Sequence, residues 1–277
     1  MTPATLPDLP GLPLPLSGAT RVYAIVGDPI AQVGSPGLFN AAFRRRGVEA
    51  ILVPLHVAPD GLADLMRMFR ATKNFDGLIV TVPHKIAIAA LIDEIGPMGR
   101  RIGAVNAIHK RDGRLVGDNF DGTGFVRGLQ AKGHGLGRRR VLVIGSGGAG
   151  RAVAHAVADE RPARLRLFDV DPARAQTVVA ELKAAAPGLD ADIGAPDPSG
   201  FDVVVNCTSV GMRPEDPFPV AVDPLGPGTL VVDIILKPTV TPLLAEAGRR
   251  GCLTHAGAPM LEGQVDAVCD FFGLAAP

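Results

Sequence analysis

The chain has 277 residues, of which 47% are hydrophobic and 20% charged, and this size and composition allow two modest domains with sizeable cores. Its 28 basic and 28 acidic residues give a formal net charge of zero, and apart from two short arginine triplets no basic block indicates a nucleic-acid-binding surface. No apolar run approaches the ~20 residues of a membrane span, so neither nucleic acid nor a membrane is predicted as a partner.

Cysteine and histidine usage bears on the cellular compartment and on metals. Cys207, Cys252 and Cys269 are widely spaced and form no Cys-x-x-Cys pair, which suits a reducing, cytoplasmic location. The six histidines show no metal-ligand spacing, so no metal site is predicted. Residues 1–18 are rich in Pro and Leu but lack the basic start and uninterrupted apolar core of a signal peptide, and we interpret them as a loosely ordered leader.

The first half of the chain alternates apolar runs with segments of helical periodicity. We expect strands over residues 21–27, 50–56 and 77–82, and helices over 36–47, 60–73 and 83–93. Ser35 is the predicted N-cap of the first helix, with Pro36 at its first position. Residues 104–109 and 115–118 are predicted to form a hairpin around an Asp-Gly turn, and a helix follows over 121–132.

Lys85 is the first candidate for chemistry. It lies in Val80-Thr-Val-Pro-His-Lys85, where a predicted strand ends and the next helix begins. The positive end of the helix dipole disfavours a cation there and would make the amine a better proton acceptor. An arginine could not serve, because it does not deprotonate. The alternative is an ordinary solvated lysine at a helix end, and the residues alone leave both open.

Two further polar stretches follow predicted strands. Gly117-Asp-Asn-Phe-Asp-Gly122 places two acids and an amide between a strand and a helix, but an Asx turn with Asp121 as N-cap is the favoured explanation of Asp121 taken alone. Asn206-Cys-Thr208 stands at the end of a later strand. Ligands of open α/β sheets lie at such strand ends, so this second stretch is a candidate binding loop.

The second half of the chain is organised around Val141–Arg151, where an apolar strand leads into Gly145-x-Gly-x-x-Gly150 and then into a helix. Gly145 would permit the tight turn, Gly147 would leave room for a pyrophosphate, and Gly150 would let the helix pack on the strand. The N–H groups that open the helix then favour the diphosphate charge. The alternative is a plain glycine-rich turn.

Asp169 strengthens the dinucleotide interpretation. It ends the next predicted strand, Leu165–Asp169, about 20 residues after the glycines, where an acidic residue accepts hydrogen bonds from the adenosine ribose. Its charge would repel a 2′-phosphate, so the sequence predicts NAD in preference to NADP. Further strands at 201–206 and 229–233, a helix over 242–250 and a last helix over 259–272 complete a strand–helix alternation typical of a parallel, doubly wound sheet.

Short motifs are spread along the chain after the leader: Gly27-x-Pro-Ile-x-x-x-x-Ser-Pro36, Val80-Thr-Val-Pro-His-Lys85, Gly103-Ala-Val-Asn106, Gly117-Asp-Asn-x-Asp-Gly122, Gly145-x-Gly-Gly-Ala149, Asn206-x-Thr208, Thr241-Pro-Leu-Leu244 and Met260–Gln264. By these motifs, which occur in the family's order, the chain resembles the shikimate dehydrogenases along nearly its whole length after the leader.

The resemblance implies an α/β protein with an N-terminal substrate domain and a C-terminal Rossmann-type NAD(P) domain with a parallel sheet. We expect residues 19–124, with a C-terminal helix at about 259–277, to form the substrate domain and 125–258 the nucleotide domain. It also implies reversible hydride transfer between NAD(P) and shikimate or 3-dehydroshikimate, with a small cyclic hydroxy acid as the binding partner. The family contains both monomers and homodimers.

Site residues follow from the same resemblance. Lys85 matches the catalytic lysine and Asp121 its acidic partner. The positions expected at the substrate are Val33, Ser35, Thr81, Asn106, Leu236 and Gln264. The positions expected at the cofactor are Gly145, Ser146, Gly147, Gly148, Ala149, Gly150, Asp169, Asn206, Thr208 and Gly257.

Departures from the family pattern bear on the substrate. Val33 stands where the family usually has Ser, Gln32 where it has His, and Leu236 where it has Tyr. Two hydroxyls associated with the substrate carboxylate are thereby lost, although Ser35 supplies one donor and Gln32 would supply another if its side chain turned inward. Quinate or another cyclic hydroxy acid is therefore an alternative substrate. A non-catalytic ligand sensor is a third possibility, which the retained Lys85–Asp121 pair and the lack of any visible DNA-binding region disfavour.

Overall fold

The computed structural model describes residues 16–274, which divide into two compact units. Within this range the first unit comprises residues 16–118 and 265–274, and the second comprises 119–264. The predicted leader lies outside the described residues except for residues 16–18, which are exposed. None of the helices in the described range combines the length and apolar character that a membrane span requires.

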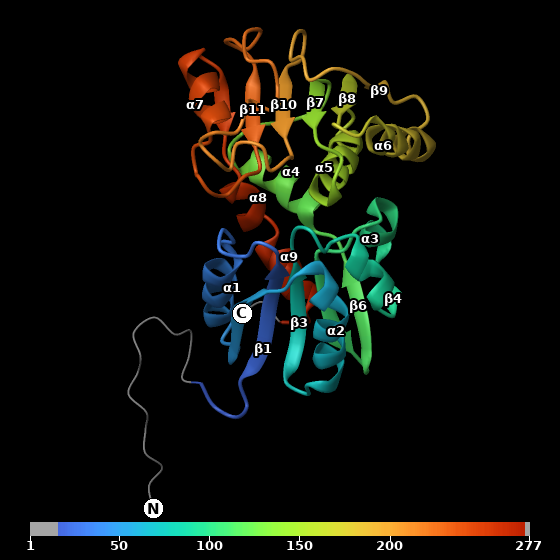
Figure 1. Ribbon diagram of the computed structural model, residues 1–277, viewed down its shortest axis with the longest axis vertical. Coiled ribbons are helices and arrows are strands. Elements are labelled where there is room, and N and C mark those ends of the chain that lie inside the picture. The colour runs from blue at the N-terminus through green and yellow to red at the C-terminus, as the bar shows by residue number, and fades with distance from the viewer. Residues whose placement is uncertain (1–15, 275–277) are drawn as a thin grey trace, which may run out of the picture. The chain divides into compact units, whose positions relative to one another are not determined.

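The first unit contains a mixed six-stranded sheet in the order β2-β1-β3-β5-β6-β4 (Figure 1). Strand β1 is parallel to both β2 and β3, β3 is antiparallel to β5, and β5 and β6 form the predicted hairpin. Its turn residues, Asp112 and Gly113, have φ angles of 51° and 77°, as a type I′ turn requires. The strand bounds are Arg21–Gly27 (β1), Ala50–His56 (β2), Phe75–Val80 (β3), Glu94–Ile95 (β4), Ala107–Arg111 (β5) and Arg114–Asp118 (β6).

Helices cover this sheet and bury its core. In α2 the apolar positions predicted from the sequence, Leu62, Leu65, Met66 and Phe69, pack on the sheet in one buried cluster. The α9 helix is tied to α1 because Arg46 donates to Asp266 at 3.0 Å and to Asp270 at 2.8 Å. The helix bounds are Ser35–Arg45 (α1), Pro59–Gly61 (η1), Leu62–Ala71 (α2), Ala87–Leu91 (η2), Pro97–Ile102 (α3) and Val265–Phe271 (α9).

Two local predictions for the first unit are wrong. The α-helix predicted from Pro83 is absent: residues 83–86 form turns, and only the short 3-10 helix η2 follows. The reason lies in a bond to another segment, because the Lys85 carbonyl accepts the backbone N–H of Val105 at 2.8 Å instead of an intrahelical one. Ser35 is not an N-cap, since α1 begins at Ser35 itself and Gly34 precedes it as the cap residue.

The second unit contains a wholly parallel six-stranded sheet in the order β12-β11-β10-β7-β8-β9 (Figure 1). The chain begins in the middle at β7, runs outward through β8 and β9, then returns to β10 and runs outward on the other side. This is the doubly wound order with a topological switch point between β7 and β10. The strand bounds are Arg140–Ile144 (β7), Arg164–Phe168 (β8), Ala191–Ile193 (β9), Val203–Asn206 (β10), Leu230–Asp233 (β11) and Leu253–His255 (β12).

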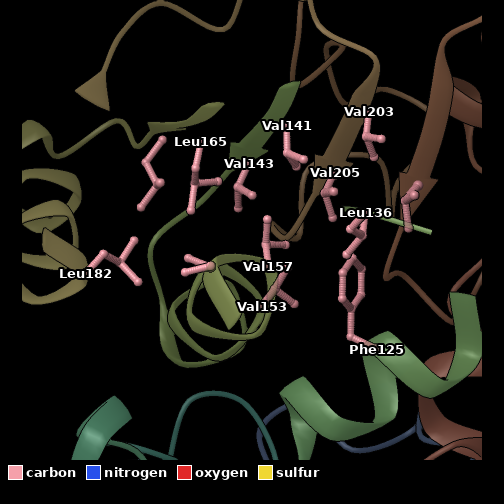
Figure 2. Close-up of a cluster of buried hydrophobic side chains, with 14 of the residues drawn as sticks. Phe125, Leu136, Val141, Val143, Val153, Val157, Leu165, Leu182, Val203 and Val205 are labelled. Atoms are coloured by element: carbon pink, nitrogen blue, oxygen red, sulfur yellow. The ribbon is translucent and has the colours of Figure 1, made fainter. Parts of the chain in front are cut away.

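Both faces of the middle of this sheet are covered, which explains why β7, β10 and β11 are apolar without alternation. Val141 and Val143 face a cluster that includes α5, with Val153 and Val157 among its members (Figure 2). On the opposite face of the sheet, Leu142, Ile144, Val204 and Val231 belong to a second cluster, which includes residues of α7. The helix bounds are Asp121–Ala131 (α4), Gly148–Asp159 (α5), Pro172–Ala185 (α6), Pro242–Arg249 (α7) and Ala258–Glu262 (α8).

The helix predicted over residues 259–272 is in fact two helices. It breaks at Gly263-Gln264, so that α8 belongs to the second unit and α9 to the first. A side chain at Gly263 would come within 2.7 Å of the Gly124 carbonyl oxygen, so α4 and the break are closely packed. The units therefore divide after Asp118 and after Gln264, a few residues from the boundaries expected at 124 and 259.

Candidate functional site

Polar residues of the first unit gather at one edge of its sheet. Strands β1 and β3 are parallel and end at this edge, and the antiparallel β5 begins there. Thr81 follows β3 and Asn106 precedes β5, and the Asn106 carbonyl accepts the N–H of Val80 at 2.8 Å. The loop after β1 joins them, because Asp28 N–H donates to the Val82 carbonyl at 3.0 Å. The structure therefore brings together three of the segments that the sequence assigned to the substrate.

The turn that carries Lys85 is held from two sides. The Lys85 carbonyl accepts the backbone N–H of Val105, the neighbour of Asn106. The adjacent His84 is buried, with 1% of its surface exposed. The Nε2 atom of His84 lies 2.7 Å from the Val57 carbonyl oxygen, and a carbonyl can only accept, so Nε2 carries the hydrogen. These bonds fix the lysine backbone where the predicted helix would have done so, and the helix-dipole argument for Lys85 does not apply.

The loop after β1 holds the positions that depart from the family pattern. Ser35 is buried in the first turn of α1, and Val33 is half-buried in the preceding loop. Gln32 Nε2 donates to the Pro29 carbonyl at 2.8 Å, so the amide serves the loop's own conformation. The expectation that Gln32 turns inward to replace a lost donor is therefore not met.

In the second unit the three glycines after β7 have the geometry that the sequence predicts. Gly145 has a φ of 97°, which a residue with a side chain rarely adopts. A Cβ at Gly150 would overlap the Gly145 carbonyl oxygen, whereas a Cβ at Gly147 would meet no heavy atom within 4 Å. Among the described residues no side chain caps the N-terminus of α5. Open space beside uncapped helix N–H groups is what a pyrophosphate requires.

Asp169 follows β8 and is fixed beside this glycine loop. Its Oδ2 accepts the N–H of Ser146 at 2.6 Å, and its Oδ1 accepts the N–H of Asp171 at 2.9 Å. Arg174, the nearby cation in sequence, lies with its Nε 3.1 Å from Asp171 Oδ2. The Asp169 carboxylate at the end of β8 is therefore fixed by two backbone N–H groups. The nearby Arg174 already has an acidic partner in Asp171.

Asn206 and Thr208 form the start of the loop after β10. Asn206 is fully buried, and its Oδ1 accepts from both the backbone N–H and the hydroxyl of Thr208, at 3.0 and 2.7 Å. Its Nδ2 donates to the Val210 carbonyl at 3.1 Å and to Asp233 at 3.2 Å. Both the oxygen and the nitrogen of the amide are thus hydrogen-bonded within the protein, so Asn206 shapes the loop instead of offering a group to a ligand.

Asp121 is the first residue of α4 and not its N-cap, which is Phe120. Asn119 Oδ1 accepts the Asp121 N–H at 3.0 Å, so the Asx turn that the sequence suggested is made by the preceding amide. A Cβ at Gly122 would lie 2.9 Å from the Ala152 carbonyl, which shows how closely the start of α4 packs on α5. The N-cap explanation of Asp121 is therefore wrong.

The remaining predicted positions also lie in the second unit. Leu236 is half-buried in the segment after β11, and Gln264 is buried at the end of α8. Gly257 precedes α8, and a Cβ there would come within 2.5 Å of the Ile234 carbonyl oxygen. Desolvation, followed by the charges of Asp233 and Asp121, raises the pKa of the half-buried Cys207 thiol. Within residues 16–274 no group of acidic, His or Cys side chains is arranged to hold a metal.

Sequence reasoning missed three residues that support these segments. His84 anchors the Lys85 turn, and Asp233 and Thr241 connect the ends of β10 and β11. Asp233 ends an apolar strand and Thr241 precedes a proline at a helix start, so a strand-end acid and an N-cap signature were both visible. Nothing in the sequence indicated that they bond to each other.

Comparisons with known proteins agree with this architecture. Residues 25–108 match the family model described as the shikimate dehydrogenase substrate binding domain. The shikimate dehydrogenase (NADP(+)) of Symbiobacterium thermophilum is 36% identical over 258 residues, which cover 89% of this chain and 87% of that protein.

Solved structures extend the comparison to the whole fold. A shikimate dehydrogenase in complex with NADP+ superposes with a TM-score of 0.87 at 29% identity, covering 95% of this chain and 93% of that one. A quinate dehydrogenase from Corynebacterium glutamicum in complex with NAD gives a TM-score of 0.80 at 26% identity, covering 92% and 94%. Together with the glycine loop and the Lys85 turn, these matches show that the chain belongs to the shikimate dehydrogenase family.

Proposed function

We propose that this chain transfers a hydride between an NAD(P) cofactor and a ring carbon of shikimate or a closely similar cyclic hydroxy acid. The observation that carries the proposal is the glycine loop, where the open space at Gly147 adjoins an uncapped helix N-terminus at the carboxyl end of a parallel sheet. The nicotinamide supplies the redox chemistry when bound, and the protein positions it.

Lys85 is the proposed acid–base group. When the alcohol carbon gives up its hydride, the hydroxyl proton must leave, and in the reverse direction the new alkoxide must gain one. An amine performs both steps, and the turn that bonds to Val105 and Val57 keeps this one in place. Asp121 of the second unit is proposed as its acidic partner, on the family resemblance. Thr81, Asn106, Ser35 and Gln264 are proposed to bind the substrate.

NAD is the proposed cofactor, in preference to NADP. The Asp169 carboxylate is held by Ser146 and Asp171 at the end of β8, where a dinucleotide-binding sheet meets the adenosine ribose. A 2′-phosphate placed beside it would be repelled, and Arg174 is paired with Asp171. This proposal differs from the NADP(+) in the name of the Symbiobacterium relative, whereas the Corynebacterium quinate dehydrogenase was solved with NAD.

A substrate panel tests the proposal. Shikimate and quinate are offered with NAD and with NADP, and NADH or NADPH formation is followed by absorbance. We expect kcat/KM to be at least about tenfold higher with NAD, equivalent to ~1.4 kcal/mol. Equal or better use of NADP would contradict the role assigned to Asp169. No turnover of either acid with either cofactor would contradict the proposed reaction.

Val33 and Leu236 favour a second candidate, a dehydrogenase of quinate or another cyclic hydroxy acid. A carboxylate that enters the protein needs donors to replace its water shell, and hydrogen bonds to a charged group are worth roughly 1.5–3 kcal/mol each. Neither side chain supplies a donor, and the Gln32 amide is bonded to Pro29. A substrate with a different arrangement of polar groups would suffer less from these replacements.

Val33→Ser is expected to lower the KM for shikimate by up to about tenfold, or ~1.4 kcal/mol, because it restores one hydroxyl donor. The gain should shrink for an analogue that lacks the carboxylate, which is the control. The measurement is KM for both compounds in the wild type and the variant. An unchanged or higher shikimate KM would mean that residue 33 does not face the carboxylate or that the natural substrate binds differently.

A further inference from the structure

A fully buried carboxylate ends β11 and is not used by the proposed reaction. Asp233 Oδ2 accepts the hydroxyl of Thr241 at 2.7 Å, and Oδ1 accepts Asn206 Nδ2 at 3.2 Å and the N–H of Ile235 at 3.1 Å. Burial raises the pKa of Asp233, and these three hydrogen bonds act against that shift. Burying an ionisable group is costly unless it is well hydrogen-bonded, and the fold supplies the hydrogen bonds that burial of this carboxylate requires.

The bonds of Asp233 join two segments that are distant in sequence. Through Asn206 it is linked to the loop after β10, because the same amide holds Thr208 and the Val210 carbonyl. Through Ile235 and Thr241 it is linked to both ends of the segment 234–241 that follows β11. One carboxylate therefore sets the relative position of two loops at the carboxyl edge of the sheet.

Two further contacts stiffen the segment after β11. Thr241 Oγ1 also accepts the N–H of Leu244 at 3.3 Å and so caps α7 while it donates to Asp233. Gly257 packs directly on the Ile234 and Ile235 carbonyls, where a Cβ would come within 2.5 and 2.6 Å. The segment is thus fastened at its start, along its backbone and at its end.

The position of these loops in the sheet gives them a role. A dinucleotide lies across the switch point of a doubly wound sheet, with one mononucleotide on each half. The glycine loop and Asp169 follow β7 and β8, so the adenosine half belongs there. The loops joined by Asp233 follow β10 and β11 on the other side of the switch point, which leaves them the nicotinamide half.

We infer that Asp233, with Asn206 and Thr241, is a positioning group for the nicotinamide half of the cofactor. It acts through the loops after β10 and β11 and does not itself contact the ligand. The inference rests on the proposed function, because it assumes that a nicotinamide dinucleotide binds this sheet. It predicts that weakening the Asp233 bonds harms binding of the whole dinucleotide while sparing its adenosine fragment.

Thr241→Val tests this, since it keeps the shape of the side chain and removes the hydroxyl that bonds to Asp233 and Leu244. The dissociation constants of NADH and of ADP, its adenosine diphosphate fragment, are measured by titration with the whole protein. We expect Thr241→Val to raise the Kd for NADH about tenfold and the Kd for ADP less than about twofold, a selective loss worth ~1.4 kcal/mol. Thr241→Ser, which restores the hydroxyl, should return both constants to within about twofold of the wild type.

Asp233→Asn is the second variant, in case Thr241→Val does not fold. It keeps the volume but places an amide where Thr241 donates, and the same selective loss of at least threefold is expected. Equal losses for the two ligands, or no loss for either, would overturn the inference while leaving the proposed function standing. A wild type that binds none of NADH, NADPH and ADP would overturn both.

Discussion

Replacing Lys85 by alanine is expected to lower kcat by about 10²–10⁴, the usual contribution of a positioned acid–base group. The Kd for NADH should change by less than about twofold, because Lys85 belongs to the first unit and the glycine loop to the second. The loss follows from the proton balance of the reaction: a hydride cannot leave the alcohol carbon efficiently unless a base takes the hydroxyl proton. The measurements are steady-state kinetics with the best substrate of the panel, and NADH fluorescence titration.

Two companion variants sharpen this test. Lys85→Arg keeps the positive charge but cannot give up a proton, so it should be nearly as inactive as the alanine variant. Lys73→Ala removes an exposed lysine from the same unit and should leave kcat unchanged. An arginine variant with most of the wild-type kcat would mean that residue 85 supplies only charge. Near-normal turnover in Lys85→Ala would rule out the acid–base role altogether.

The parts of the fold that follow local rules could be predicted from the sequence. Apolar runs such as Val141–Ile144 become strands buried on both faces, and the Asp112-Gly113 pair turns the hairpin. The glycine loop was predictable where its constraint is local: a Cβ at Gly150 would overlap the carbonyl oxygen of Gly145, five residues earlier in the chain.

The two helix predictions that are wrong depend on contacts between distant segments. The helix expected after Pro83 does not form because the Lys85 carbonyl bonds to Val105, twenty positions later in the chain. The last helix breaks at Gly263-Gln264, where α8 packs on the glycine face of α4. Hydrophobic periodicity carries no information about such partners. The helical spacing in 83–93 fits a helix as well as it fits the turns and the short 3-10 helix that form there. The spacing in 259–272 fits one helix as well as it fits two.

The candidate site shows the same division between features that the sequence predicts and features that only the folded chain reveals. The family motifs singled out Lys85, Asp121 and the proposed cofactor loops, but they did not distinguish residues that support the candidate site from residues proposed to face a ligand. Asn206 is the clearest case, because its amide bonds to Thr208, Val210 and Asp233 and so belongs to the supporting framework. His84 and Asp233 support the site in the same way, and only the hydrogen bonds of the folded chain identify them.

The glycines of the loop allow a second test with a large expected effect, because two of them differ in what surrounds them. A Cβ at Gly147 meets nothing within 4 Å, and the backbone there has a φ of −70°, which alanine adopts freely. Gly147→Ala should therefore fold normally, with a melting temperature close to that of the wild type. If the open space is where the pyrophosphate binds, the added methyl group overpacks the bound state, which typically costs ~1–3 kcal/mol, or about 5- to 150-fold in the Kd for NADH.

Gly150→Ala is the matched variant, since its Cβ would overlap the Gly145 carbonyl oxygen in the protein itself. The added methyl group then overpacks the folded protein itself, which destabilises it by ~1–3 kcal/mol. The melting temperature should therefore drop by several degrees even without cofactor. Melting curves and NADH titrations of the two variants separate a glycine that leaves room for the ligand from one that leaves room for the fold. Wild-type NADH affinity in Gly147→Ala would show that the pyrophosphate does not approach this backbone, and the anion site would then have to lie elsewhere on the carboxyl edge of the sheet.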